Sequence, residues 1–328
     1  MVLDRGGFHV IDFRYHLVSI VSIFLALAVG IVLGAGPLKE DIGNRLTQQT
    51  SVLRTEKSQL RTELDAEKRG TAARDTFSAA VAPVIAKGQL TGKIIALVVA
   101  PGADADLVKS TTASLVIAGA KVGSTITLTD AWADPAKRTF RNTLANQLAA
   151  LVKAPLAANS PDQLAATVLA RAILGGTDQS TQRVDPSASA ALEGLLAGDL
   201  VKVSPDQIVP SSGVVFLGGA VKGTTQEDTD ARLATYVQLV RSLDVAGSGV
   251  VVVTASNTTD PTLSAELVAA VRKDPEAVKV ASTVDNADLP MGETTLVLAL
   301  AQQYSGGVGQ YGLAADAKAI APDITAKK

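Results

Sequence analysis

The sequence predicts three parts in series: a single N-terminal transmembrane helix, a long coiled-coil-like helix, and an α/β domain with a mainly parallel sheet and flanking helices. Three observations predict this architecture. Residues 17–38 contain no charged side chain, residues 39–82 contain no proline and space leucines by seven, and apolar runs alternate with helical patterns from residue 92 onward. We therefore expect a tail at 1–16, an anchor at 17–38, a coiled-coil helix at 39–82 and an extracytoplasmic domain at 92–328.

The anchor prediction depends on length. A helix needs about 20 predominantly apolar residues to cross the hydrocarbon core of a bilayer, and this stretch supplies them without one charge. Small residues recur at every fourth position, which lets two helix backbones approach closely in lipid. These positions are Ser22, Ala26, Gly30 and Gly34. We expect membrane helix packing there, although small residues are also frequent in membrane helices that do not associate.

A cleaved signal peptide is the alternative to a retained anchor. The apolar core of a signal peptide runs for about 7–15 residues and ends at small residues. The sequence Gly34-Ala35-Gly36 offers small residues, but the apolar stretch is longer than such a core and Pro37 follows directly. We therefore expect the anchor to be retained.

The segment before the anchor mixes aromatic and charged residues, among them Arg14 and His16. Basic residues flank the anchor on both sides, so the positive-inside rule does not fix its orientation. The short tail favours a tail inside the cell and the bulk of the chain outside, in the cell envelope. We interpret Arg14 and His16 as a candidate docking motif for a cytosolic partner, with a partly ordered tail as the alternative.

The region after the anchor combines a narrow apolar seam with many charged side chains. Leu46, Leu53 and Leu60 lie seven residues apart, a spacing typical of coiled coils. The companion positions Thr50 and Lys57 are polar, so the seam is imperfect. Because a lone solvated helix of this kind is marginal, we expect a partner helix and hence a homodimer.

The composition excludes several kinds of chemistry. The chain has no cysteine, two histidines and two methionines, and its formal net charge is −2. The absence of cysteine excludes disulfides and thiolate sites, and the charge gives no basic footprint for nucleic acid. Both histidines, His9 and His16, precede the anchor, so the region beyond it can form no Ser-His-Asp triad and has few ligands for soft metals. We predict a non-enzymatic protein with no catalytic residue, no cofactor and no metal site.

Strand-like and helix-like patterns alternate in the large C-terminal region. Apolar strand-like runs occur at 93–100, 122–128, 213–217, 249–254 and, as a last candidate, 277–282. Helix starts that combine a capping residue with proline occur at Asp134-Pro135, Ser160-Pro161 and Asp260-Pro261. Apolar residues at helical spacing follow them. This alternation predicts an α/β fold with a mainly parallel sheet.

Ligands of open α/β sheets bind at the carboxyl ends of the strands. The corresponding loops here are 101–106, 218–220 and 255–258. None of them is a P-loop or a dinucleotide fingerprint. Asp104 and Asp106 could hold a hard cation, but two acids at a helix N-terminus more often complement the helix dipole. One G-x-G-x-x-G pattern occurs at 307–312, but it follows a helix and precedes none, so we interpret it as a C-terminal loop.

The segment around the anchor resembles a known family. The shared pattern comprises Arg14, His16, Ser19, residues 24–30 and residues 32–34. The charged helix and the Ala/Val-rich α/β region extend the likeness over essentially the whole chain. The chain is thus similar to the actinobacterial copper-transporter family of mycobacterial copper transport protein B, the MctB family.

The resemblance implies a single-pass envelope protein with a role in copper transport or homeostasis. It also implies an alternative, because some relatives serve daughter-cell separation together with a cytosolic partner and a peptidoglycan hydrolase. In that alternative, the protein is an envelope adaptor or scaffold that dimerises by its coiled coil and links a cytosolic partner to cell-wall remodelling. A single anchor helix cannot enclose a pore by itself. Both functions stay open at this point, as does the choice between the inner and outer envelope membrane.

Overall fold

The computed structural model describes residues 13–35, 37–153, 161–174, 185–204, 209–257 and 265–323, with the side chains of the second helix described from residue 44 onward. The chain divides into two compact units, Met1–Ala72 and Ala73–Lys328, and each is described by itself. The predicted helix starts at Ser160 and Asp260 lie outside the described residues.

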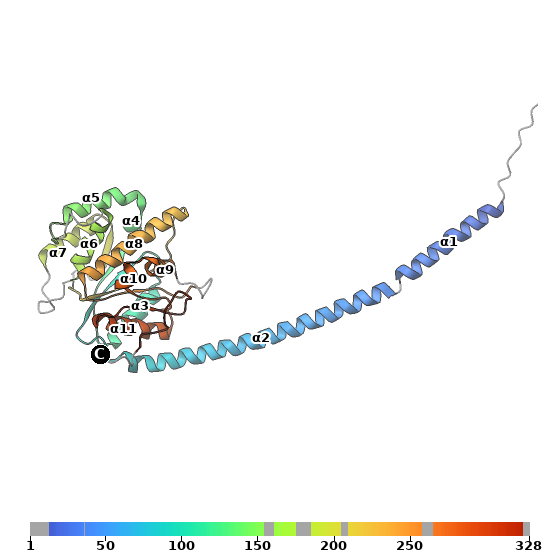
Figure 1. Cartoon of the computed structure of the whole chain (residues 1–328), viewed down its shortest axis with the longest axis horizontal. Helices are drawn as coiled ribbons and strands as arrows, with labels where there is room; N and C mark the ends of the chain where they lie inside the picture. Colours follow the sequence, from blue (N-terminus) through green and yellow to red (C-terminus); the bar gives the residue numbers. More distant parts are fainter. Residues whose placement is uncertain are drawn as a thin grey trace, which may run out of the picture. The chain divides into compact units, whose positions relative to one another are not determined.

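The first unit contains α1 (Phe13–Ala35) and most of α2 (Pro37–Ala86), which Figure 1 shows. Within the described part of the chain, Phe13–Gly34 is the one span long and apolar enough to cross a membrane, with a mean hydropathy of 2.8. The Ser22 hydroxyl donates to the Val18 carbonyl oxygen at 2.8 Å, so this polar group is satisfied within the helix. The predicted N-terminal apolar helix is confirmed.

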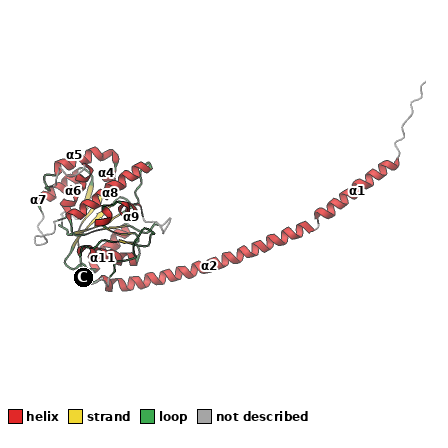
Figure 2. Ribbon diagram, in the orientation of Figure 1, coloured by secondary structure: helices red, strands yellow, loops and turns green. Residues whose placement is uncertain are grey.

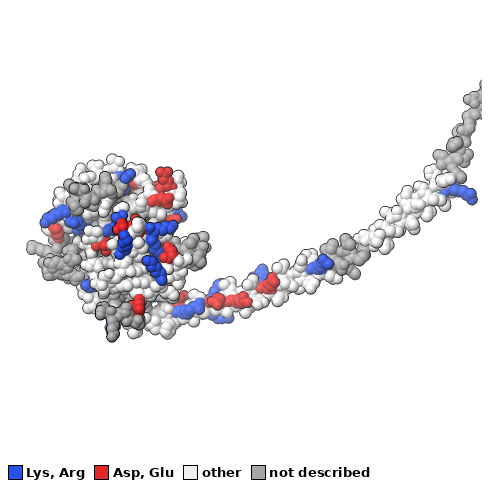
Figure 3. Space-filling model, viewed as in Figure 1, with Lys and Arg blue, Asp and Glu red and all other residues white. Residues whose placement is uncertain are grey.

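The helix α2 is long and carries charged side chains of both signs, as Figure 3 shows. The hydroxyls of Thr50, Thr55 and Thr62 donate to carbonyl oxygens four residues earlier, at 2.7, 3.0 and 3.0 Å. The prediction of a long helix is confirmed, but α2 ends at Ala86 rather than at residue 82. It continues through Pro83, which has no N–H to donate, and the Lys87 N–H donates to the Pro83 carbonyl oxygen at 3.1 Å just after the last turn.

The second unit is built on a seven-stranded sheet with the strand order β3-β2-β1-β4-β5-β6-β7. Its strands, yellow in Figure 2, are β1 (Ile94–Val99), β2 (Lys121–Leu128), β3 (Val201–Ser204), β4 (Gly213–Leu217), β5 (Val250–Val253), β6 (Ser282–Val284) and β7 (Gln310–Tyr311). Every neighbouring pair is parallel except β2 with β3. The predicted α/β fold with a mainly parallel sheet is therefore confirmed.

Helices cover both faces of this sheet, because successive residues of a strand point to opposite sides. In β1, Ala96 and Val98 belong to one apolar cluster, and Ile95 and Leu97 belong to the other. The first cluster packs against α5 (Arg138–Leu148), α6 (Pro161–Ile173), α7 (Pro186–Ala197), α8 (Gln226–Ala246) and α9 (Glu266–Lys273). The second packs against the end of α2, α3 (Ala105–Ile117) and α11 (Pro290–Tyr304). Short helical turns lie at α4 (Asp130–Ala133), η1 (Pro135–Lys137) and α10 (Ala277–Val280).

The prediction of a strand over 277–282 is wrong. Its first residues form α10, and β6 begins only at Ser282. The Asp274 carboxylate accepts the backbone N–H groups of Glu276 and Ala277 at 3.1 and 2.7 Å and so caps a helical turn there. The hydrogen bonds to Asp274 thus favour a helical turn, although the apolar residues of 277–282 alternate as in a strand.

The interpretation of residues 307–312 as a loop needs correction as well. Gln310 and Tyr311 form β7, which pairs in parallel with β6 at the edge of the sheet. The backbone N–H of Thr283 also donates to the Gly309 carbonyl oxygen at 3.1 Å. The glycine-rich stretch is therefore part of the sheet rather than a nucleotide-binding turn.

Candidate functional site

The strand order reverses direction at β1, because β2 lies on one side of it and β4 on the other. In doubly wound sheets, such a switch point is where ligands bind, outside the carboxyl ends of the strands. The structure brings the three loops that follow the strands together there, around a cavity of about 400 Å³ that we call the strand-end cavity. The cavity is lined by Gly102, Asp104, Leu107, Gly218, Gly219, Ala220, Lys222, Thr254, Ala255, Ser256, Asn257, Ala265 and Glu266.

The loops after β1 and β4 touch through their backbones. Gly102 has φ +75°, a left-handed conformation that favours glycine. A Cβ atom on Gly219 would fall on backbone atoms of Pro101, Gly102 and Ala103, so only glycine fits there. This contact closes the gap between the two loops, and the open cavity lies beside it.

Carboxylates occupy the helix N-termini at this cavity. The Asp104 carboxylate accepts the backbone N–H of Asp106 at 2.7 Å and caps α3. Glu266, in the first turn of α9, accepts the backbone N–H of Val221 at 3.2 Å. These negative charges already complement the positive ends of the helix dipoles, so the two helix N-termini disfavour phosphate-like anions, and Lys222 is the one cation among the residues that line the cavity.

Two buried polar side chains lie at the ends of β5 and β6. Thr254 is 2% exposed and Asn286 is 1% exposed. Backbone hydrogen bonds of 3.0 Å tie this corner together, from Thr254 N–H to Val284 O and from Ala287 N–H to Thr254 O. The Thr254 hydroxyl and both amide atoms of Asn286 have no hydrogen-bond partner among the described residues. This corner therefore has hydrogen-bonding capacity beyond what the fold itself uses.

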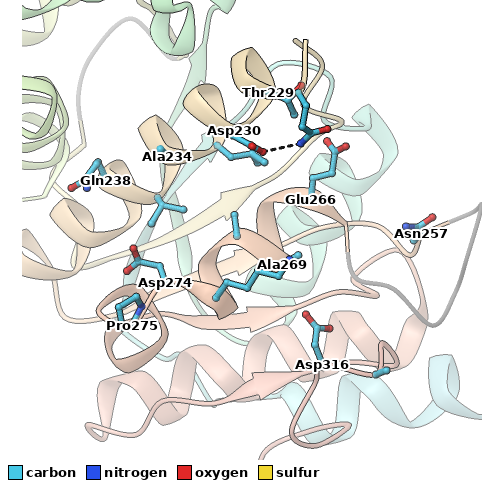
Figure 4. A pocket seen from close by; sticks show the side chains of 16 residues that line it. Thr229, Asp230, Ala234, Gln238, Asn257, Glu266, Ala269, Asp274, Pro275 and Asp316 are labelled. Atoms are coloured by element: carbon cyan, nitrogen blue, oxygen red, sulfur yellow. Dashed lines mark hydrogen bonds between the residues drawn. The ribbon is translucent and has the colours of Figure 1, made fainter. Parts of the chain in front are cut away.

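A larger hollow of about 850 Å³, which we call the α8–α9 groove, lies between these two helices and is seen from close by in Figure 4. It is lined by Gln226, Thr229, Asp230, Leu233, Ala234, Val237, Gln238, Asn257, Glu266, Ala269, Ala270, Lys273, Asp274, Pro275, Ala315 and Asp316. The groove and the strand-end cavity share Asn257 and Glu266, so the two hollows meet at these residues.

Acidic side chains predominate in the α8–α9 groove. Asp230, Glu266, Asp274 and Asp316 line it, and Lys273 is the one basic residue among its lining residues. The groove therefore has a formal charge of −3 from four acids and one lysine, against −2 for the whole chain. In Figure 4 these carboxylates come from α8, from both ends of α9 and from the C-terminal segment.

A further acid at the start of α8 is already paired. Asp228 forms an ion pair with Arg232 at 2.9 Å. The backbone N–H of Thr224, together with the Arg232 guanidinium, holds the pKa of Asp228 below its usual range against the opposing effect of desolvation. Arg232 is thus engaged beside the groove and does not line it.

Arg272 of α9 holds the C-terminal segment to the end of β6. Its Nη1 lies 2.9 Å from Asp285 and 2.7 Å from Asp316, so two carboxylates share one guanidinium. Its Nε donates to the Thr283 hydroxyl at 2.9 Å, and its Nη2 donates to the Tyr311 carbonyl at 2.7 Å. The guanidinium therefore joins α9, β6, β7 and the segment beyond them.

The residues predicted to pack in the membrane lie on α1. Ser22, Ala26, Gly30 and Gly34 recur every four residues and so share one face of the helix. A Cβ atom on Gly30 or Gly34 would meet nothing within 4 Å, which leaves room for a second backbone. Their packing role stays a prediction.

The other predicted site residues are exposed. Leu46, Leu53 and Leu60 on α2 are 63%, 63% and 64% exposed. Arg14 and His16 lie exposed in the first turn of α1. In the part of the chain that the structure describes, no group of three or more histidine, aspartate or glutamate side chains is placed to hold a metal ion.

Comparison with known proteins identifies relatives along almost the entire chain. Residues 10–322 match the family described as "Copper transport outer membrane protein, MctB". Proteins called "Copper transporter MctB" in Mycobacterium bovis and Mycobacterium tuberculosis are 26% identical over 307 residues, which cover 92% of this chain and 96% of each relative. A protein of the same name in Mycobacterium leprae is 28% identical over 338 residues, covering 94% of this chain and 98% of the relative.

Proposed function

Because the chain belongs to the MctB family, we propose that it is a single-pass protein of the cell envelope with a role in copper transport or homeostasis. The observation that carries this proposal is the extent of the family match, which covers residues 10–322 and so includes the apolar helix as well as the α/β domain. In this proposal α1 is a retained anchor, the domain lies outside the cytoplasm, and the role is not enzymatic.

Copper is the transported substrate in this proposal, and the metal-ligating side chains of the chain limit how tightly it can be bound. Copper(I) favours thiolate and thioether ligands, but the chain has no cysteine and only two methionines. Of these, Met291 alone lies in the α/β domain, in the first turn of α11. We infer that the domain does not bind copper(I) tightly by itself and that transport requires other chains.

Copper measurements test both parts of this proposal. Calorimetric titration of the purified full chain in detergent with copper(I), under reducing conditions, should reveal no tight stoichiometric site. Deletion of the gene should raise cellular copper, measured by mass spectrometry. A tight site would contradict the inference about ligands, and unchanged copper would contradict the transport role. Unchanged copper together with failed daughter-cell separation would favour the envelope adaptor instead.

The proposed topology has a separate test. Protease added to spheroplasts should digest the α/β domain if it lies outside the cytoplasmic membrane. A cytoplasmic protein of the same cells, which must stay intact, is the control. Protection of the domain would overturn the orientation.

We also propose that α2 pairs with α2 of a second copy as a coiled coil. Leu46, Leu53 and Leu60 are more than half exposed, so a partner helix would remove substantial apolar surface from water. Burial of each such leucine is worth about 1.5–3 kcal/mol, which supports the pairing of an otherwise solvated helix.

The charges beside these leucines favour a parallel pair. With the leucines at heptad position d, Glu56 and Glu63 occupy g positions, and Arg61 and Lys68 occupy e positions. In a parallel dimer each g residue faces the e residue of the following heptad on the other helix. Glu56 then meets Arg61 and Glu63 meets Lys68, so both pairs attract. Thr50 and Lys57 take a positions, where polar residues help to fix the register at a cost in stability.

Sedimentation of the full chain in detergent tests the coiled coil. Leu53→Lys should weaken dimerisation by about 3 kcal/mol, a factor of roughly 100, because one buried leucine is lost from each helix. Val52→Lys is the matched control, since Val52 is 49% exposed but lies off the seam. Glu56→Arg should weaken the dimer, and adding Arg61→Glu should restore it. A monomeric wild-type chain would contradict the proposal.

A further inference from the structure

The α8–α9 groove is a surface that the proposed copper role does not use. It is the larger of the two hollows described above, at about 850 Å³. Its lining combines small apolar side chains with spaced carboxylates. We propose that this groove docks a lysine- and arginine-bearing peptide segment of a partner protein.

The apolar part of the groove is formed by aliphatic side chains of two facing helices, α8 and α9. Leu233 and Val237 lie four residues apart on α8 and therefore on one face. Ala234 on α8 and Ala269 and Ala270 on α9 present only methyl groups, so the helices leave volume between them. Such a surface suits the aliphatic stems of lysine and arginine, whose charged ends reach outward.

The carboxylates are spread along the groove rather than gathered at one point. Glu266 and Asp274 flank α9 at its two ends, about 12 Å apart for a helix of this length. Asp230 comes from α8, and Asp316 comes from the C-terminal segment, as Figure 4 shows. This spacing matches several cations carried on one extended segment.

Among the described residues, three of these four carboxylates accept hydrogen bonds from neutral donors only. Asp230 accepts the Gln226 side-chain amide at 2.8 Å, and Glu266 accepts a backbone N–H at 3.2 Å. Asp274 accepts two backbone N–H groups. All these donors are neutral, so none of them contributes a positive charge beside the carboxylates. Asp316 does meet Arg272, but that guanidinium also serves Asp285.

Other ligand classes fit the groove less well. Its charge of −3 repels anions. Among the described residues, no group of three or more acids or histidines could hold a metal ion. The groove also continues into the strand-end cavity at Asn257 and Glu266, which favours an elongated ligand over a compact one.

Fluorescence anisotropy with the full chain in detergent tests the proposal. The probe is a fluorescein-labelled glycine-serine peptide with lysine at every third position, which does not form a helix of its own. The double variant Asp230→Asn, Glu266→Gln removes two groove charges but keeps both acceptor oxygens, so the fold is preserved. We expect it to raise the Kd of the peptide about fivefold, since exposed ion pairs contribute roughly 0.5 kcal/mol each.

A charge-matched control separates docking from general attraction. The double variant Asp106→Asn, Glu227→Gln removes the same charge from exposed positions that do not line the groove. It should change the Kd less than about twofold. An equal loss of affinity in both double variants would overturn the proposal, because the peptide would then respond only to net charge.

A second variant tests the groove without altering charge. Ala234 lines the groove and is exposed, so Ala234→Trp fills the hollow while leaving the buried core in place. We expect this variant to lose most of the peptide binding. Binding at the wild-type Kd, with the far-UV circular dichroism also unchanged, would place the peptide elsewhere and refute the assignment.

Discussion

The ion pair between Arg272 and Asp285 allows a sharp stability prediction. Both side chains are nearly fully buried, at 4% and 3% exposure, and Nη1 lies 2.9 Å from Oδ2. Arg272→Met keeps an unbranched apolar stem but leaves a buried carboxylate without its cation, which costs about 3–5 kcal/mol. For a domain of this size each kcal/mol lowers the Tm by about 2–4 °C, so we expect a fall of about 10 °C.

The matched control is Lys279→Met. Lys279 pairs with Glu276 at 3.0 Å, but these side chains are 64% and 56% exposed, so the loss should stay below about 1 kcal/mol. Thermal and urea unfolding of the full chain, followed by circular dichroism, measure both effects. Adding Asp285→Asn to Arg272→Met should recover part of the loss, because no uncompensated charge then remains buried. Equal losses for Arg272→Met and Lys279→Met would refute the reasoning.

Two further predictions concern titration and loop contact. Burial raises the pKa of Asp244, in the last turn of α8, above 3.8. The folded state then binds more protons than the unfolded state just above pH 3.8, so stability falls as pH rises through that interval. Asp244→Asn should remove this fall and stabilise the chain by about 0.5 kcal/mol at pH 7, measured by urea unfolding across pH. Gly219→Ala should lower the free energy of unfolding by about 3 kcal/mol, because its Cβ would fall on neighbouring backbone atoms. The control Gly92→Ala, at φ +76° with no atom near the new Cβ, should lower it by about 1 kcal/mol. Equal losses of stability would contradict the loop contact.

The parts of the fold that could be predicted are those encoded by continuous local patterns. An uncharged run of 22 residues predicts α1 because lipid demands such a run. Strands buried on both faces appear as apolar runs, and for this reason β1, β4 and β5 are evident in the sequence. These strands, with the helical spacing between them, suffice to predict a parallel sheet.

The parts that could not be predicted depend on contacts between distant segments. β3 and β7 are four and two residues long at the sheet edges, so neither provides enough sequence for a pattern. The α8–α9 groove joins acids as far apart as Asp230 and Asp316, and only the folded chain brings them together. The sequence does place the three strand-end loops correctly, but the contact of Gly219 with Gly102 depends on the approach of two backbones.

The contact at Gly219 makes the switch point of this sheet differ from a dinucleotide-binding one. Doubly wound sheets bind dinucleotides where the loops at the switch point separate and a helix N-terminus faces the pyrophosphate. In this chain the two loops are closed on each other at Gly219, and Asp104 already caps the helix that would face an anion. The open volume instead extends past Glu266 into a groove lined by carboxylates. The α8–α9 groove thus presents carboxylates where related architectures bind phosphates, which agrees with our proposal of a cationic peptide as its ligand.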